Sequence, residues 1–207
     1  MNINYHKLCL EEISMLTNKK KILLHSCCAP CSSYVITFLS NYFDITILYY
    51  NPNIAPKEEY EKRKEEQIRL IKSIQTKNNL DYLDCDYDNE IYNNAITGFE
   101  NVPEGGSRCS ICFNLRLEKT AQMAKHNKYD YFCSTLTVSP HKNAKIINEI
   151  GQNISKKYNI KWLYSDFKKN EGFKQSIELS KKYELYRQDY CGCIYSKNAI
   201  KKQGITN

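Results

Sequence analysis

The sequence lacks a long uninterrupted run of apolar residues at its beginning. Its first residues, MNINYHKLCLEEISMLTNKKK, mix polar and apolar side chains throughout, so they predict neither a signal peptide nor a membrane span. An internal repeat and a low-complexity linker are lacking as well. The 207 residues can build a core that needs no covalent staples. We expect a single α/β domain over residues 1–207, with a helical extension at 1–20 and a helical C-terminal part at 165–207.

The even scatter of cysteines that marks a small secreted disulfide scaffold is also missing. Seven of the ten cysteines gather in three tight clusters, namely Cys27, Cys28 and Cys31, then Cys109 and Cys112, then Cys191 and Cys193. We expect a reducing cytoplasm for this chain, and clustered thiols in that compartment indicate metal or redox chemistry. The other three, Cys9, Cys85 and Cys133, are interpreted as packing residues.

Positive charge is present but unevenly placed. The formal net charge is +7, and residues 138–207 hold fourteen Lys/Arg against six Asp/Glu. A basic face of this kind suits a polyanion such as nucleic acid. Taken alone, the charge favours an ordinary solvated surface, because the whole composition is rich in lysine, asparagine, isoleucine and tyrosine.

Short apolar runs alternate with longer amphipathic segments, a pattern typical of βα units and a mainly parallel sheet. The predicted strands are Lys21–Ser26, Ile45–Asn51, Tyr82–Asp86, Tyr131–Thr137 and Lys161–Tyr164. Helices are predicted around Cys9, from Cys109 onward, and at Ser32–Ser40, Lys57–Lys77, Asn143–Tyr158, Glu171–Tyr183 and Ile194–Gln203. The expected apolar stripe of the helix at 143–158 is Ile146, Ile150, Ile154 and Tyr158.

Three segments follow predicted strands. They are Cys27–Cys31, Asn51–Asn53 and Ser134–Pro140. Ligands of open α/β sheets bind beyond the carboxyl ends of the strands. We therefore expect these segments to converge on one site.

The first thiol cluster precedes a predicted helix. The amides and dipole of that helix start are expected to lower the pKa of Cys27, Cys28 and Cys31, which favours the thiolate that binds metal or attacks. A disulfide between the adjacent Cys27 and Cys28 would be badly strained, so metal binding is the better interpretation.

The other two clusters leave several chemistries open. Cys109, Cys112 and Arg116 lie on neighbouring faces of one helix, at i, i+3 and i+7. A Cys-x-x-Cys pair can serve zinc, an iron–sulfur cluster or thiol exchange. The pair Cys191-Gly-Cys193 can bind metal or close into a strained, easily reduced disulfide. Four thiolates satisfy a zinc or iron–sulfur site, and three surplus thiols beside such a site favour redox work.

Five ordered motifs together resemble the QueH-type epoxyqueuosine reductases. These motifs are LLHSCCAPC, YYNPNIAPKEEYEKR, EGGSRCSICFNLRLEKTA, STLTVSPHKN and ELYRQDYCGC, and they extend from about Lys21 to Cys193. The resemblance implies a Rossmann-like fold similar to that of PP-loop proteins. It also implies a cobalamin-independent enzyme that removes the epoxide oxygen of epoxyqueuosine at the wobble position of tRNA.

The same resemblance implies a division of the seven clustered thiols. Cys27, Cys28, Cys109 and Cys112 would hold a [4Fe–4S] cluster, and Cys31 would bind an additional iron or zinc ion. Cys191 and Cys193 would form a redox-active pair, reduced again by an unidentified electron donor.

Other residues of the motifs are candidates for contacts with the substrate. Tentative contacts to tRNA are Arg108, Arg116, Arg187, Asn51, Asn53 and Lys142. Candidate proton donors are His25, Glu104 and Tyr190.

Two rival functions are weighed against the reductase. A tRNA thiolase of PP-loop type would need an ATP-binding SGGxDS loop after the first strand, where this chain has HSCCAPC. A zinc-stabilised RNA-binding module would be colourless, whereas an iron–sulfur protein is brown.

Overall fold

The computed structural model describes residues 3–202, apart from the side chains of residues 200–202. Residues 1–2 and 203–207 of the expected terminal parts lie outside this range. The interpretation of the chain as one domain stays a prediction. In the described part, no helix has both the length and the apolar character needed to cross a membrane.

A five-stranded parallel sheet forms the centre of the molecule, with strand order β3-β2-β1-β4-β5. The strands are β1 (Lys20–His25), β2 (Phe43–Leu48), β3 (Leu80–Leu83), β4 (Tyr131–Ser134) and β5 (Lys161–Trp162). The helices are α1 (Tyr5–Ser14), α2 (Ala29–Leu39), α3 (Lys57–Ser73), α4 (Asn89–Ala95), α5 (Ser107–His126), α6 (Ala144–Tyr158), α7 (Gly172–Lys182) and α8 (Ile194–Lys202). The predicted Rossmann-like α/β class is confirmed.

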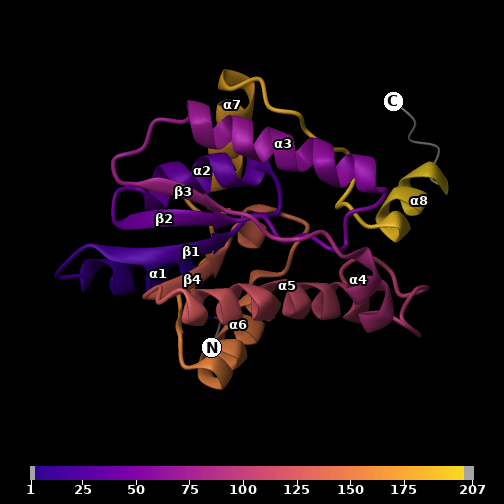
Figure 1. Ribbon diagram of the computed structural model, residues 1–207, viewed down its shortest axis with the longest axis horizontal. Coiled ribbons are helices and arrows are strands. Elements are labelled where there is room, and N and C mark those ends of the chain that lie inside the picture. The colour runs from indigo at the N-terminus through magenta and orange to yellow at the C-terminus, as the bar shows by residue number, and fades with distance from the viewer. Residues whose placement is uncertain (1–2, 203–207) are drawn as a thin grey trace.

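Helices cover both faces of the sheet, with α2, α3 and α7 on one side and α5 and α6 on the other (Figure 1). Successive side chains of β1 pack alternately on the two faces of the sheet, as this arrangement requires. Ile22 and Leu24 belong to the core under α2, whereas Leu23 belongs to the core under α5 and α6. Because side chains of a strand point alternately to opposite faces, a strand buried on both sides must be apolar throughout.

The order of the strands reverses between β1 and β4. The chain runs outward from β1 to β2 and β3, then returns to place β4 on the other side of β1. Loops leave this point in opposite directions and open a crevice at the carboxyl ends of the strands. The segments after β1 and β4 both border it.

Strand ends are the main correction to the predicted elements. The pairing of β2 with β3 ends at Leu48 and Leu83, so the segments 49–51 and 84–86 are loops. The strand expected to reach Thr137 ends at Ser134, whose hydroxyl accepts a hydrogen bond from the Leu136 amide. The chain turns there into the 3₁₀-helix η1 (Thr135–Val138). The strand predicted at 161–164 ends at Trp162, and α4 was missed.

The predicted stripe of α6 packs on the core, with Ile154 buried, but the most deeply buried face of the helix is rotated by about one position. Its buried apolar residues include Ile147 and Ile154, whereas Ile146 and Ile150 are only partly buried. Gly151 explains the rotation, since a Cβ at this position would lie 2.4 Å from the Trp162 ring. The glycine lets the helix approach the end of β5 along that side.

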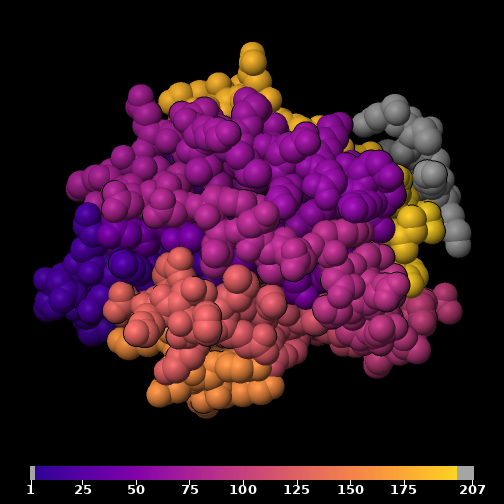
Figure 2. Space-filling model, in the orientation of Figure 1, coloured from indigo at the N-terminus to yellow at the C-terminus, as the bar shows by residue number. Residues whose placement is uncertain are grey.

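The C-terminal part crosses to the far end of α3 and α4. Tyr92 of α4 and Ile96, which directly follows this helix, pack with Cys112 and Cys193, against the partly buried Tyr195 of α8. In Figure 2 the yellow atoms of the C-terminal part lie against the magenta atoms of the α3–α4 region. This packing brings the third cysteine cluster to the other two.

Candidate metal and redox site

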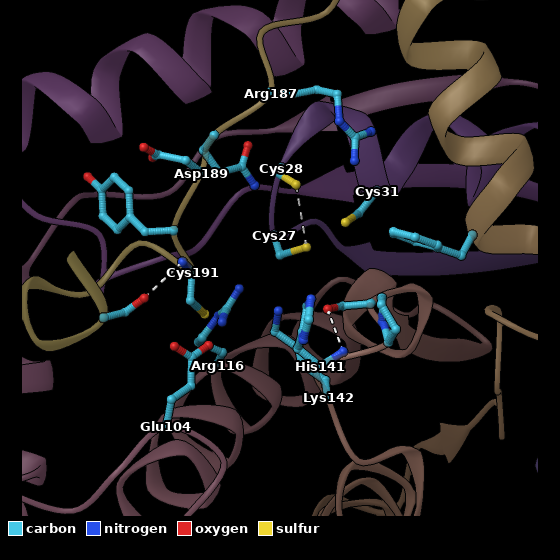
Figure 3. Close-up of a pocket in the computed structure, with 16 residues that line it drawn as sticks. Cys27, Cys28, Cys31, Glu104, Arg116, His141, Lys142, Arg187, Asp189 and Cys191 are labelled. Atoms are coloured by element: carbon cyan, nitrogen blue, oxygen red, sulfur yellow. Dashed lines mark hydrogen bonds between the residues drawn. The ribbon is translucent and has the colours of Figure 1, made fainter. Parts of the chain in front are cut away.

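A cavity of about 570 Å³ lies at the carboxyl ends of β1 and β4 (Figure 3). Thiols of Cys27, Cys28 and Cys31 line it from the turn between β1 and α2, and Cys191 lines it from the loop before α8. Its remaining walls include Glu104, Arg116, His141, Lys142, Phe173, Arg187, Gln188, Asp189 and Tyr190. The predicted convergence of the segment after β1 with the segment after β4 is therefore observed.

The first three thiols form a compact group. The sulfur atoms of Cys27, Cys28 and Cys31 all lie within 4.8 Å of one another, and those of Cys27 and Cys28 are 3.8 Å apart. Thr135 of η1 fixes this group, because its Oγ1 accepts from the Cys27 amide at 3.1 Å and donates to the Cys27 sulfur at 3.2 Å. Three sulfurs at this spacing are able to bind a common metal ion.

The pKa values of these thiols differ from the expectation. Hydrogen bonds from the thiols of Cys28 and Cys31, with the charges of Lys142 and Arg116, hold the pKa of Cys27 well below its usual value. The pKa of Cys28 is raised to about 11 and that of Cys31 is raised well above its usual value, in each case chiefly because the thiol donates to Cys27. The prediction that the helix start lowers the pKa of all three thiols was wrong. The Cys27 thiolate is stabilised by hydrogen bonds from Cys28 and Cys31, and these two thiols must keep their protons to donate them.

A second, smaller cavity of about 70 Å³ adjoins the first. The sulfur-bearing residues that line it are Cys109 and Cys112 of α5 with Cys191 and Cys193. The Gly105 amide donates to the Cys109 sulfur at 3.2 Å, and a φ of 89° at Gly105 suits glycine alone. Because Cys191 lines both cavities, it joins the two groups of thiols. All seven clustered cysteines border this pair of cavities.

Arg116 lies between the thiols with only 2% of its surface exposed. Its Nη1 donates to the Cys112 sulfur at 3.9 Å, its Nε to His25 at 3.2 Å, and its Nη2 to Asn51 Oδ1. Within residues 3–199 no carboxylate oxygen lies within 4.0 Å of this guanidinium. Burial lowers its pKa, but Cys112, Cys27 and Cys191 together raise the value above the usual range.

The half-buried Lys142 lies on the same side of the cavity as Arg116 and is surrounded by sulfur in a similar way (Figure 3). Burial works against its charge, yet Cys191, Cys27 and Cys31 raise its pKa well above the usual value. Buried cations need a compensating negative charge. Here the groups available beside Arg116 and Lys142 are sulfur atoms. The site therefore fits thiolates, the form that binds an iron–sulfur cluster or a metal ion.

His25 supports Arg116 from behind and is completely buried. Burial and the charge of Arg116 lower the pKa of this imidazole to about 3, so the ring is neutral. Its Nε2 accepts from Arg116 Nε at 3.2 Å and also lies 3.1 Å from the Tyr50 carbonyl oxygen, and its Nδ1 lies 2.8 Å from Ser134 Oγ. The ring lies outside both cavities and orients Arg116 rather than donating a proton to a ligand.

Some of the residues predicted to contact the substrate lie away from the larger cavity. Asn51 is 1% exposed and is occupied by Ser26 and Arg116, whereas Asn53 borders the smaller cavity with its Oδ1 unpartnered among the described residues. Arg108 is 4% exposed, donates to the carbonyls of Glu100 and Val102, and lines neither cavity. This placement gives a contact between Arg108 and RNA no support.

The remaining candidates border the larger cavity. Arg187 lies beside Cys31 and is held by a hydrogen bond to Ser180 Oγ at 3.0 Å (Figure 3). Tyr190 has its pKa raised to about 12, mainly by burial, and donates to the Ala55 carbonyl. Glu104 borders both cavities and is therefore the proton-donor candidate with access to either group of thiols.

Helix α3 clamps the loop that carries Cys191, a role that was missed. Arg63 is 2% exposed; its Nε pairs with Glu59 at 2.6 Å and its Nη1 reaches the Cys191 carbonyl at 3.4 Å. The i,i+4 spacing of Glu59 and Arg63 explains their ion pair within the helix but not the contact with Cys191. Local spacing gives no signal of a partner 128 positions further along the chain.

A second pair on α3 holds the start of this loop. Glu66 accepts from the Tyr186 amide at 2.6 Å and from Arg69 at 2.7 Å. Arg69 also donates to the carbonyls of Tyr183 and Glu184. Together the two pairs connect α3 to both ends of the segment 183–191.

A parallel sheet with thiols collected at the reversal point of its strand order defines a cysteine-rich α/β protein built for metal or redox chemistry. The family model described as "Epoxyqueuosine reductase QueH" matches residues 22–199, and the chain belongs to this family. The resemblance carried by the five motifs is confirmed.

The sequence similarity to curated relatives extends over nearly the whole chain. It is 43% identical over 209 residues to "Epoxyqueuosine reductase QueH" of Streptococcus pyogenes serotype M1, covering 98% of this chain and 80% of that protein. The protein of the same name from Staphylococcus epidermidis is 44% identical, with 98% and 87% covered. That of Thermotoga maritima is 35% identical, with 84% and 89% covered.

The fold is also found among solved structures, of which we name one. It is described as a predicted subunit of tRNA methyltransferase from Methanocaldococcus jannaschii, with a TM-score of 0.53, 12% identity and 90% of each chain covered. At this identity the similarity concerns the fold alone.

Proposed function

We propose that this chain is an epoxyqueuosine reductase, an oxidoreductase that converts epoxyqueuosine in tRNA to queuosine in a reducing cytoplasm. Family membership supports the activity and does not favour the thiolase or the zinc-stabilised module. The structural observation that carries the proposal is the meeting of seven thiols from three distant segments at two cavities that share Cys191.

The reaction sets requirements that the thiols are able to meet. Opening the epoxide to an alkene breaks two C–O bonds, consumes two electrons and two protons, and releases water. Cys27, Cys28, Cys109 and Cys112 would hold a [4Fe–4S] cluster, with Cys31 binding an additional iron or zinc. When bound, the cluster would supply single electrons and the second metal a Lewis acid.

Cys191 and Cys193 would act as the store of two electrons. As their sulfurs form a bond, they release two electrons and two protons, which balances the reduction of one epoxide. An external dithiol or other reductant would then restore both thiols. The place of Cys191 on both cavities supports this role, because it is close to either group of sulfurs.

The larger cavity would receive the modified nucleoside. Its volume, about 570 Å³, is in the range of small-molecule sites. Phe173 and Tyr190 offer aromatic surfaces to a base, and Arg187 and Lys142 offer cations to the ribose phosphate. A base of a single-stranded anticodon loop can leave its stack and enter such a cavity. Glu104, which borders both cavities, is the proposed proton donor.

The decisive experiment is anaerobic reconstitution with iron and sulfide, followed by incubation with epoxyqueuosine-containing tRNA and a reductant. Mass spectrometry of the nucleosides should show loss of one oxygen from epoxyqueuosine. Protein reconstituted with zinc alone is the control and should leave the nucleoside unchanged. A brown, fully reconstituted protein that leaves the epoxide intact would contradict the proposal.

A further inference from the structure

We propose that the RNA strand next to the inserted nucleotide lies with its phosphates in a groove lined by Lys142, Lys145, Lys168 and Lys169. This inference rests on the proposed function, since it takes tRNA as the substrate. The groove has a volume of about 510 Å³ and is formed by residues 3–5 at the start of α1, the loop before α6, the first turn of α6 and the loop after β5. We call it the lysine groove.

The lysine groove shares a wall with the thiol cavity. Lys142 lines the groove, the larger cavity and the smaller cavity. A nucleotide inserted among the thiols leaves its two neighbours within one phosphate of the cavity mouth. Only a cationic surface that continues from the mouth can bind those phosphates, and the groove is such a continuation.

Charge in the groove is strongly unbalanced. Asp166 supplies the one carboxylate among the residues that line it, and Lys168 pairs with this carboxylate at 2.6 Å. Lys145 is 69% exposed and lies 3.8 Å from Glu149, at the long limit of an ion pair. For Lys142 and Lys169, the described residues provide no carboxylate within 4.0 Å. The start of α6 adds the positive end of its dipole.

The opposite rim of the thiol cavity would repel RNA. Glu104 and Asp189 lie there on either side of Cys191, away from Cys31 (Figure 3). Phosphates are therefore expected to leave the cavity on the Lys142 side. The exposed lysines of the groove provide counterion release as the driving force, which makes the contact dependent on salt.

A second basic hollow provides a matched control. It is lined by Lys20, Lys125, Lys128 and Lys161, with a volume of about 570 Å³. Lys20 begins β1 and Lys161 begins β5, so this hollow lies at the amino ends of the strands, opposite the thiols. It has the same lysine content as the groove but no wall in common with the thiol cavity.

The test compares two double variants of the full chain, Lys145→Gln with Lys169→Gln, and Lys125→Gln with Lys128→Gln. All four lysines are exposed, so both proteins should fold. The dissociation constant for epoxyqueuosine-containing tRNA is measured without reductant over a series of salt concentrations. In the groove variant the association constant should depend less steeply on salt. The magnitude of the slope of its logarithm against log salt should decrease by about 1.4, since each single-strand phosphate contact contributes about 0.7. The control variant should keep the wild-type slope.

Two outcomes would overturn the inference. One is an unchanged slope in the groove variant, and the other is an equal decrease in both variants, which would mean diffuse surface charge. Both are read from binding, whereas the proposed function is read from loss of oxygen by the wild-type enzyme. A reductase with an inert groove and a tRNA-binding protein without reductase activity are therefore distinguishable.

Discussion

Arg116 donates to the Cys112 sulfur at 3.9 Å from one turn further along the same helix. This pair is the closest link between the second cysteine cluster and the polar network behind the thiols, because the same guanidinium binds Asn51 and His25. Negatively charged sulfur would balance this buried cation, and the pKa of Cys27 is lowered accordingly, whereas burial raises the pKa of Cys112 to about 12.

We expect Arg116→Gln to bind iron about tenfold more weakly, the lower end of the loss seen when a residue that orients a metal ligand is removed. Arg116→Lys should recover part of the affinity because it restores the charge without the planar fork. Iron content and visible absorption after anaerobic reconstitution measure the effect.

Arg108→Gln is the matched control for Arg116. It removes a buried arginine of the same helix that binds two carbonyl oxygens and stacks on Tyr195, and no thiol. It should lower thermal stability while the iron content of the folded protein stays at the wild-type value. Equal iron loss in both variants would refute a specific role for Arg116.

Cys191→Ser should abolish multiple turnover, because the proposed store of two electrons needs both sulfurs. Nucleoside mass spectrometry with excess tRNA over enzyme measures the number of turnovers. Cys85→Ser is the control, since this half-buried thiol lines neither cavity and should keep full activity. Wild-type turnover by Cys191→Ser would exclude the dithiol.

Glu66→Gln should destabilise the protein at neutral pH by about 1 kcal/mol, the value of a charge-assisted hydrogen bond discounted for partial exposure. The hydrogen bond from Arg69 is the main cause that holds the pKa of Glu66 below its usual value, with a further contribution from the Tyr186 amide.

The pH dependence of this effect has a definite sign. Between the lowered folded pKa and the ordinary unfolded value of about 4.3, the unfolded chain binds more protons, so stability falls as pH falls. The difference between wild type and Glu66→Gln should therefore be full near neutrality and shrink below that unfolded value. Urea unfolding at a series of pH values tests this, and a difference that stays constant into acid would contradict it.

Gly151→Ala should cost about 1–3 kcal/mol through overpacking. A methyl group here would lie 2.4 Å from the Trp162 ring, which cannot retreat because its Nε1 is hydrogen-bonded to Asn148. Trp162 is the single tryptophan of the chain, so its fluorescence reports both the shift and the unfolding. The exposed Gln152→Ala on the same helix should leave both unchanged.

Local patterns predicted the fold class and the position of Cys27, Cys28 and Cys31, because a strand followed by a helix start is encoded over a few residues. They did not predict where β2 ends, since Tyr49 continues the apolar run although pairing with β3 stops at Leu48. The end of a strand depends on its neighbour in the sheet, which is distant in sequence.

Contacts within the site were the least predictable part. Arg63 and Arg116 sit on helices whose spacing explains their faces, but their partners lie 128 and 91 positions away. The distribution of charge among the first three thiols also escaped prediction. It depends on which sulfur receives the hydrogen bonds, a matter of ångström-scale geometry rather than of helix position.

If Cys191 and Cys193 are the proposed redox pair, their unequal exposure would set an order of events for its regeneration. Cys193 is 7% exposed and packs with Tyr92, whereas Cys191 lines the larger cavity. An incoming thiolate must attack along the S–S axis, and the larger cavity is lined by Cys191 but not by Cys193. The mixed disulfide would thus form on Cys191 and expel Cys193 as the leaving group, so the recycling partner must insert its own nucleophile into the space that the nucleoside has just vacated.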